Sequence, residues 1–345
     1  MPNRPAFGKR TVKQIRTVGI IGAGIAGLAC AQSLHRSGVE VTVLEKSRGV
    51  GGRVATRRID SGVTFDHGAQ YFTVRESAFA AAVQEWCDAG TAGLWQGRIV
   101  ILSHGLVTDL HEPRERYVGV PAMNAIAKAL ATGMDVRTNV TAQAIHQSDG
   151  KWQVEDSTST RHGPFDLLIS TAPPIQTIKL LGSQSATIEN AASNITMTPC
   201  WAVLLQMREP LELEYDAAFV HDSPLNWLAR NSSKPERGAA QSWVMHATAD
   251  WSIAHLEDSA ESIAKTLVEE FWQATKQAPR PLELVMAHRW RYALPQEPLP
   301  QRYLLDGDLN LAVCGDWCGG PRVEGAYLSG LALAQAVLEM NKIAD

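Results

Sequence analysis

Residues 17–27 read TVGIIGAGIAG, and this stretch decides the fold. It leads from an apolar strand into a helix, the context in which a Gly-x-Gly-x-x-Gly spacing indicates a dinucleotide-binding turn. Gly22 allows the tight turn, Gly24 lets the backbone approach a pyrophosphate, and Gly27 lets the helix lie close to the strand. Ala26 lies in the same turn and is included among the predicted contacts.

The same stretch begins a β-α-β unit. A strand is predicted over Thr17–Gly22, a helix over Ile25–Ser37, and a second, parallel strand over Val39–Glu45. The N-terminus of that helix offers free N–H groups and partial positive charge to phosphates. Glu45 stands 18 residues after the last motif glycine, where a carboxylate accepts hydrogen bonds from ribose hydroxyls and repels a 2′-phosphate. NADP is therefore disfavoured as the resident dinucleotide. Lys46, next to Glu45, is also predicted to contact the bound dinucleotide.

A second glycine-rich segment, Gly49–Arg53, follows directly. Gly51 and Gly52 bring another stretch of backbone close to the dinucleotide, and Arg53 offers a planar guanidinium to phosphate. Simple NAD dehydrogenases do not need this loop, so it points to a larger dinucleotide.

A third motif lies near the C-terminus. Gly315-Asp316 follows a predicted strand, and the segment Arg322–Ala326 (RVEGA) opens the last helix. Together the three motifs resemble the FAD-binding pattern of glutathione-reductase-like and amine-oxidase flavoproteins. The resemblance implies that Asp316 holds the ribityl chain and that the last helix points its N-terminus at the flavin, where its dipole stabilises negative charge.

The 345-residue chain has the composition of a globular protein, with 45% hydrophobic and 20% charged residues. Its net charge of −4 argues against a nucleic-acid partner, and the absence of a run of 18 apolar residues argues against a membrane span. Five cysteines without a Cys-x-x-Cys pair or a secretory signal predict reduced thiols, no metal site and a cytoplasmic location. The basic residues 1–16 are predicted to be a flexible extension, and the oligomeric state stays open.

The predicted fold class is α/β, with a Rossmann-type FAD-binding domain like that of glutathione reductase and monoamine oxidase. This domain is discontinuous and comprises residues 17–75, 118–176 and 302–345. Residues 76–117 and 177–301 form an inserted substrate domain of antiparallel sheet plus helices, with the active site between the two domains. Further helices are predicted over 77–88, 121–131, 257–275 and 324–340, and further strands over 94–111 (a hairpin), 136–146, 151–156, 165–171, 201–208, 225–230, 242–247, 282–290 and 309–314.

Five further strings make the resemblance more specific. They are DHGAQYFT at 66–73, WLARN at 227–231, SWVMHAT at 242–248, HRWRY at 288–292 and CGDWC at 314–318. With the glycine motifs they resemble bacterial renalases over roughly residues 18–340. The resemblance implies non-covalent FAD and oxidation of β-NAD(P)H isomers that carry the hydride at nicotinamide C2 or C6, giving NAD(P)⁺. It also implies a preference for the 2-dihydro isomer, and reoxidation of the flavin by oxygen, giving hydrogen peroxide, or by another acceptor.

The predicted site follows from these motifs. A dihydronicotinamide becomes aromatic when it gives up hydride, so no proton has to be removed and no general base is predicted. The small-molecule dinucleotide substrate is predicted to contact residues on the inserted domain and the last helix, namely His246, Trp290, Tyr292, Arg322 and Asn231. The predicted FAD contacts are Gly22, Gly24, Ala26, Gly27, Glu45, Lys46, Gly52, Arg53, Gln70, Tyr71, Val140, Gly315, Asp316 and Val323.

A flavin-containing amine oxidase is the main alternative. By resemblance, monoamine oxidases carry an aromatic-cage tyrosine where this chain has Arg322, a cation that would repel a protonated amine. They also place a lysine near the flavin through a water, and the segment Met197–Trp201 that should supply it has none. Residues 281–309 lack the cysteine that binds flavin covalently. A carotenoid-type desaturase or isomerase is a further alternative, disfavoured by the soluble composition. A non-enzymatic FAD-binding protein is another, which would hold flavin yet show no reduction by any dihydronicotinamide.

Overall fold

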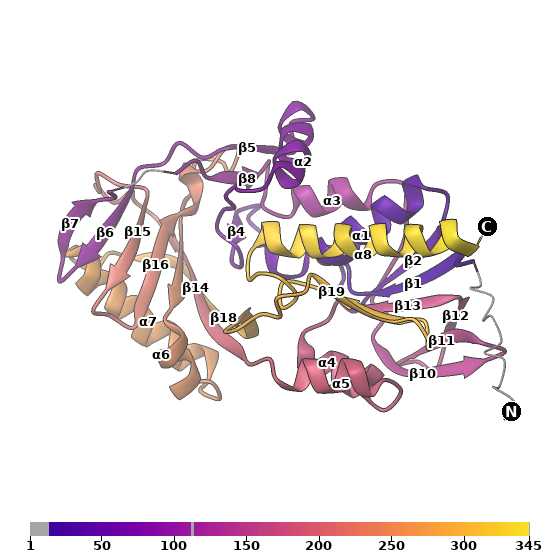
Figure 1. Cartoon of the computed structure of the whole chain (residues 1–345). Helices are drawn as coiled ribbons and strands as arrows, with labels where there is room; N and C mark the ends of the chain where they lie inside the picture. The colour runs from indigo at the N-terminus through magenta and orange to yellow at the C-terminus, as the bar shows by residue number, and fades with distance from the viewer. Residues whose placement is uncertain (1–13, 112–113, 345) are drawn as a thin grey trace, which may run out of the picture.

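The computed structural model of the protein describes residues 14–111 and 114–344, so most of the predicted N-terminal extension lies outside the described residues. Two large β-sheets form the frame of the molecule and lie at opposite ends of the view in Figure 1. Helices pack on each sheet, and the connecting loops between the sheets carry the candidate site. This arrangement confirms the predicted α/β fold class with two sheets of different character.

The first sheet contains the predicted dinucleotide-binding unit. Its strand order is β19-β20-β13-β1-β2-β9, and all neighbours are parallel except β19 and β20. Parallel neighbours need crossover connections, which is why strands from three distant segments of the chain meet here. The members are β1 (Thr17–Ile21), β2 (Glu40–Glu45), β9 (Asp135–Thr138), β13 (Leu167–Ser170), β19 (Tyr303–Asp306) and β20 (Leu311–Cys314).

Both faces of this sheet are covered, as in other parallel sheets. Leu167 and Ile169 pack into one core, whereas Leu168 between them packs into the opposite core. Helices cover the first face and the small sheet β10-β11-β12 covers the second (Figure 1). The covering elements are α1 (Ile25–Arg36), α3 (Ala125–Ala131), α8 (Val323–Ala344), β10 (Ala142–Ser148), β11 (Lys151–Asp156) and β12 (Arg161–Phe165).

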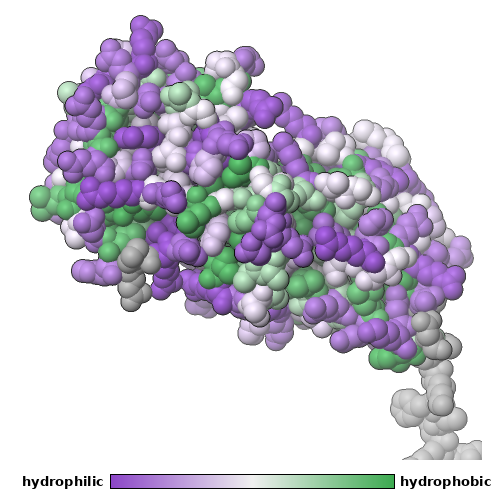
Figure 2. All heavy atoms as spheres, turned by 90° about the horizontal axis from the view of Figure 1, so that it is seen from above, coloured by the Kyte–Doolittle hydropathy of each residue, from purple (hydrophilic) through white to green (hydrophobic). Residues whose placement is uncertain are grey.

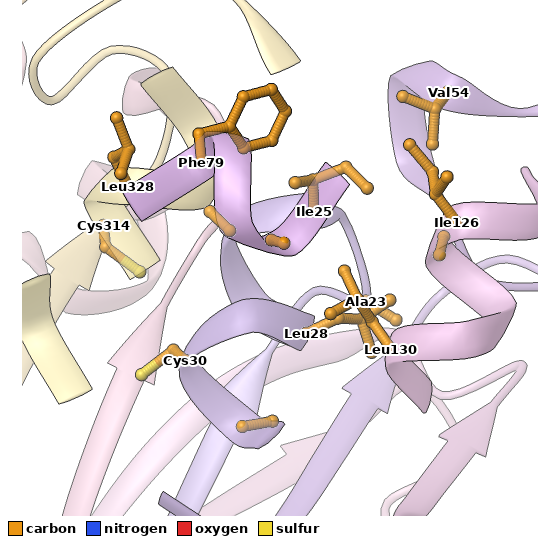
Figure 3. Close-up of a cluster of buried hydrophobic side chains, with 14 of the residues drawn as sticks. Ala23, Ile25, Leu28, Cys30, Val54, Phe79, Ile126, Leu130, Cys314 and Leu328 are labelled. Atoms are coloured by element: carbon orange, nitrogen blue, oxygen red, sulfur yellow. The ribbon is translucent and has the colours of Figure 1, made fainter. Parts of the chain in front are cut away.

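The core on the helical face joins segments that are far apart in the sequence. Figure 3 shows Leu28 of α1, Leu130 of α3, Phe79 of α2 (Ser77–Asp88) and Leu328 of α8, all of which are buried in one cluster. The C-terminal helix therefore shares one core with the helix that follows the N-terminal strand.

The second sheet has the strand order β18-β14-β17-β16-β15-β6-β7 and is antiparallel except where β15 meets β6. On one face Trp243 and Met245 pack against α7, which supplies Phe271. On the other face Val244 packs against Phe65 of the first domain, so this face looks toward the glycine motifs. The elements are β6 (Ile99–Ser103), β7 (Leu106–Asp109), β14 (Met197–Met207), β15 (Ala217–His221), β16 (Leu225–Arg230), β17 (Gln241–Ala247), α6 (Ala249–Ala254), α7 (Ala260–Thr275) and β18 (Leu282–Pro295).

The remaining elements are short and lie in the segments that connect the longer ones. They are η1 (Gly52–Val54), β3 (Thr56–Arg58), β4 (Thr64–Asp66), β5 (Ala92–Leu94), β8 (Tyr117–Gly119), α4 (Pro174–Thr177), η2 (Ile178–Gly182), α5 (Ala186–Ser193) and η3 (Asn231–Ser233). On the face seen from above, hydrophilic and hydrophobic residues are interspersed (Figure 2). Within the described ranges, no helix is both long and apolar enough to cross a membrane.

Two element predictions are wrong. The helix predicted over 121–131 begins only at Ala125, because the preceding turn is held by hydrogen bonds from Met123 N–H to Asp66 Oδ1 and from Asn124 N–H to Thr56 Oγ1. The strand predicted over 136–146 is two strands in different sheets, β9 and β10. They are separated by Asn139, whose φ is 59°.

Other boundaries shift by a few residues. The hairpin within 94–111 is confirmed, with its turn at His104-Gly105. The helix predicted from 257 begins at Ala260 because the Ser259 hydroxyl accepts the Ser262 N–H as its N-cap. The strand predicted to end at 290 continues to Pro295, which lengthens this strand of the second sheet.

Candidate functional site

The glycine motif forms an open cradle at the end of β1. Gly24 and Gly51 are paired by a parallel bridge, and Gly51 N–H donates to Ala23 O at 2.8 Å. A Cβ on Gly24 would have no neighbour within 4 Å, whereas a Cβ on Gly27 would collide with the carbonyl oxygen of Gly22. Gly24 therefore leaves room for a ligand to approach the backbone, and Gly27 is required by the close helix–strand packing.

The electrostatics of this cradle suit a dinucleotide. Glu45 is 5% exposed, and its carboxylate accepts the N–H groups of Ala23 at 2.8 Å and Ser47 at 2.7 Å. It thereby fixes the turn against β2 at the position expected for a ribose. The N-terminus of α1 has no side-chain cap and no acidic residue in its first turn, so its N–H groups remain available to an anion.

The second glycine loop and the third motif meet directly. The Arg53 guanidinium donates to both carboxylate oxygens of Asp316, each at 2.6 Å, and to Ala293 O at 2.9 Å. In this structure the Arg53 guanidinium is thus paired with Asp316. The contact of Arg53 with phosphate stays a prediction. This ion pair joins Arg53 in η1 to Asp316 just after β20. The second glycine loop and the third motif therefore lie side by side.

The other predicted cofactor residues surround this cradle. Val140 N–H donates to Glu45 O at 2.9 Å, which places it at the end of β2, and Lys46 next to it is exposed. Val323 is the first residue of α8. The open space at Gly24, the uncapped helix and the placement of Glu45 fit FAD, which these residues would hold through its phosphates and ribose.

A buried ion cluster lies behind the loop that follows β4. Asp66 Oδ2 accepts from Arg237 Nη2 at 2.8 Å and Nε at 3.0 Å, and Lys234 Nζ lies 3.5 Å away. All three side chains are 0% exposed. Burial opposes ionisation of Asp66, but Lys234 and Arg237, together with the hydrogen bonds from Met123 N–H and Thr56 Oγ1, outweigh it and lower the pKa of the carboxyl. Burial lowers the pKa of Lys234 to about 8. The sequence offered no signal for this cluster, because 232–238 reads as an ordinary polar loop.

This cluster fixes Gln70 and Asn231. Gln70 accepts a hydrogen bond from Lys234 at 3.2 Å, and its amide donates to Asp66 O and to Gly68 O. Asn231 is fully buried, donating to Thr64 O and accepting from Asp66 N–H. Its predicted contact with substrate is not supported by this geometry, because both ends of the amide are used within the framework.

Three histidines and a tryptophan form a wall where β17 and β18 of the second sheet meet the loop that follows β4. His67 stacks on Trp290 with ring centroids 5.0 Å apart, and its ring meets His288 edge-on at 4.7 Å. The carbonyl oxygen of His67 accepts from Trp290 Nε1 at 2.8 Å and from His246 Nε2 at 3.2 Å. The predicted substrate residues His246 and Trp290 are therefore brought together, and sequence reasoning missed His67 and His288, although both lie in quoted strings.

The three imidazoles are neutral at physiological pH. Burial, and to a lesser extent His288, lowers the pKa of His67 to about 4. Burial likewise lowers the pKa of His246 to about 4, and burial followed by the charge of Arg57 lowers that of His288. The wall thus presents aromatic faces and ring nitrogens without charge.

The remaining predicted residues lie around this wall. Tyr292 is half-buried on β18, two residues beyond Trp290. Tyr71 is half-buried, its ring 5.5 Å from that of Trp227. Arg322 is exposed just before α8 and makes no ion pair within the described part of the chain. Its predicted role is neither supported nor opposed by a contact.

Cavities of about 470 Å³ beside Tyr117 and about 370 Å³ beside Gly97 lie away from the histidine wall. Across residues 14–111 and 114–344, no group of three or more His, Cys, Asp or Glu side chains could hold a metal ion.

Comparison with known proteins gives the family. Residues 20–86 match the model of an NAD(P)-binding Rossmann-like domain, and residues 85–338 match that of the flavin containing amine oxidoreductases. Curated relatives match over short segments. Human lysine-specific histone demethylase 2 is 53% identical over 55 residues, which is 16% of this chain and 7% of that protein. A putative flavin-containing monoamine oxidase, AofH, of Mycobacterium tuberculosis is 40% identical over 86 residues, 25% of this chain and 19% of that protein.

Solved structures match over nearly the whole chain. A putative protoporphyrinogen oxidase from Exiguobacterium has a TM-score of 0.74 at 13% identity, covering 94% of this chain and 99% of that one. A triple mutant of putrescine oxidase has a TM-score of 0.72 at 15% identity, with the same coverage. At these identities the likeness establishes the fold, while the family model covers most of the sequence. The chain therefore belongs to the flavin-containing amine oxidoreductase family, and its cofactor is FAD.

Proposed function

We propose that the protein oxidises dihydronicotinamide dinucleotides that carry the hydride at C2, and also at C6, to NAD(P)⁺. The observation that carries this proposal is the uncharged wall formed by His67, His246, His288 and Trp290 beside the dinucleotide cradle. Bound FAD would supply the hydride acceptor, and oxygen or another acceptor would take up the electrons.

The wall suits the chemistry of such a substrate. A dihydronicotinamide ring is flat and uncharged, and it becomes aromatic on losing hydride without losing a proton. The protein therefore needs to place the ring, and Trp290, half-buried and held against His67, offers aromatic surface for that purpose. Neutral imidazoles also avoid repelling the cationic ring of the product.

Amine oxidation is the second candidate, because the family model and AofH favour it. The structure contains a buried lysine, Lys234, although it does not lie on the segment Met197–Trp201 that, by resemblance, supplies the lysine in monoamine oxidases. Its ammonium lies 3.2–3.5 Å from Gln70, Asn231 and Asp66, one acceptor for each of its three N–H groups. No N–H is left to hold a water beside the flavin, which weighs against a lysine–water arrangement of the amine oxidase kind.

Anaerobic stopped-flow absorbance separates the two candidates. The FAD-loaded protein is mixed in turn with 2-dihydro-NAD, 6-dihydro-NAD, ordinary NADH and a primary amine. The proposal expects rapid bleaching of the flavin band by the 2-dihydro isomer and slow bleaching by NADH. Bleaching by the amine alone would establish the second candidate, and bleaching by none of the four would refute both.

A further inference from the structure

The pairing of strands places two histidines in one row across the second sheet. In β17 His246 lies opposite Ala202 of β14, and in β18 His288 lies opposite the same Ala202. Opposite residues of antiparallel strands project from the same face, so both imidazoles stand on the face that looks toward the first domain. Ala202, which separates the two histidines, contributes only a methyl group and is fully buried.

The hydrogen bond of His246 fixes which of its nitrogens carries the proton. His67 O can only accept, so Nε2 of His246, 3.2 Å away, is the donor. In a neutral imidazole the other nitrogen, Nδ1, then carries a lone pair. Burial keeps this ring neutral, since its pKa is about 4. His246 thus carries a hydrogen-bond acceptor at Nδ1.

The candidate substrate has one donor group on its ring. The ring nitrogen bears the ribose and has no hydrogen, so only the carboxamide N–H₂ at C3 can donate from this part of the molecule. We propose that Nδ1 of His246 accepts a hydrogen bond from the carboxamide and so orients the nicotinamide ring. This inference rests on the proposed function and names the residue that recognises the carboxamide of the substrate.

The orientation has a consequence for which isomer reacts. C2 is bonded to C3, whereas C6 lies across the ring from it. Anchoring the group on C3 therefore fixes the position of C2 more closely than that of C6. His246 is accordingly a specificity-determining residue for the 2-dihydro isomer, and misplacement by 1 Å costs about a hundredfold in rate.

A binding experiment tests this without relying on turnover. The flavin spectrum of the loaded protein is titrated with NAD⁺ and with 3-acetylpyridine adenine dinucleotide, in which a methyl group replaces the carboxamide nitrogen. The wild-type protein is expected to bind NAD⁺ roughly two- to tenfold more tightly than the analogue, the size of one neutral hydrogen bond. His246→Phe, which keeps a ring without an acceptor, should bind the two equally.

Two further variants separate recognition from packing. His246→Asn places a carbonyl oxygen near the position of Nδ1 and should restore part of the preference. Trp290→Phe removes the other donor to His67 O and should keep the preference even if both ligands bind more weakly. Equal loss for both ligands in His246→Phe, with the ratio unchanged, would overturn the inference. A wild-type protein that is reduced by neither dihydro isomer would instead overturn the proposed function on which it rests.

Discussion

Replacing Asp66 by asparagine removes one charge from the buried ion cluster while keeping the size of the side chain. In the wild-type protein Oδ1 accepts from Thr56 Oγ1 at 2.7 Å and from Met123 N–H at 3.0 Å. Oδ2 faces the Arg237 guanidinium and the Lys234 ammonium. Asparagine presents an N–H₂ group to one of these donor pairs and leaves two cations without a counter-charge.

The magnitude follows from burial. All three side chains of the cluster are 0% exposed, so water cannot replace the lost carboxylate. Breaking one partner of a buried pair costs about 3–5 kcal/mol. The free energy of unfolding is therefore expected to fall by about that amount, which is a large part of the 5–15 kcal/mol typical of folded proteins.

The assay is urea-induced unfolding of the FAD-loaded protein, followed by tryptophan fluorescence. The matched control is Glu257→Gln, because Glu257 also pairs with two cations, Arg289 and Arg291, but its side chain is 70% exposed. The control is expected to unfold almost like the wild type, since solvent screens exposed pairs. If Asp66→Asn shifts the unfolding midpoint no more than Glu257→Gln, the reasoning from burial is refuted.

Three further predictions concern pH and cofactor binding. Because the folded-state pKa values of His67 and His246 are lowered from 6.5 to about 4, the unfolded chain binds protons in that window that the folded protein does not. The free energy of unfolding should therefore fall as the pH drops from 6.5 to 4, by up to about 1.4 kcal/mol per pH unit for each histidine. Urea titrations across this range measure it, and a free energy of unfolding that does not change with pH would contradict the prediction. Gly27→Val should abolish FAD binding, since any Cβ meets Gly22 O; the flavin-to-protein absorbance ratio after purification checks this, and a normal ratio would refute it. Arg53→Met should weaken FAD binding about tenfold in equilibrium dialysis, the value of one charge-assisted hydrogen bond, and an unchanged dissociation constant would remove Arg53 from the site.

The parts of the fold that local residues determine could be predicted from the sequence. The unit from β1 to β2 needs only an apolar strand, three glycines and a helix, all within the stretch from 17 to 45. The break at Asn139 could not be predicted, because it depends on Val140 N–H reaching Glu45 O, far away in the chain. The same holds for the start of α3, where Met123 N–H is taken by Asp66.

The buried cations show the same limit more strongly. Lys234 and Arg237 lie in a stretch of serine, lysine, proline, glutamate and glycine that is typical of an exposed loop. Both are buried because Asp66, 168 and 171 residues away in the chain, lies against them. A charged residue is buried only with a partner, and the partner is supplied by the tertiary fold. Periodicity and motif spacing carry no information about such a pairing.

The histidine wall lies between these two cases. His67, His246 and Trp290 belong to three strings that carry the renalase resemblance, yet nothing in the sequence required those strings to meet. In the structure they converge on one carbonyl oxygen, that of His67, across separations of 179 and 223 residues. One carbonyl oxygen thus accepts from both β17 and β18 and ties the three residues together. Under the proposed function we expect substrate preference to depend on the junction between the second sheet and the loop after β4. Single substitutions there must be interpreted against the variant that removes the other donor to the same oxygen.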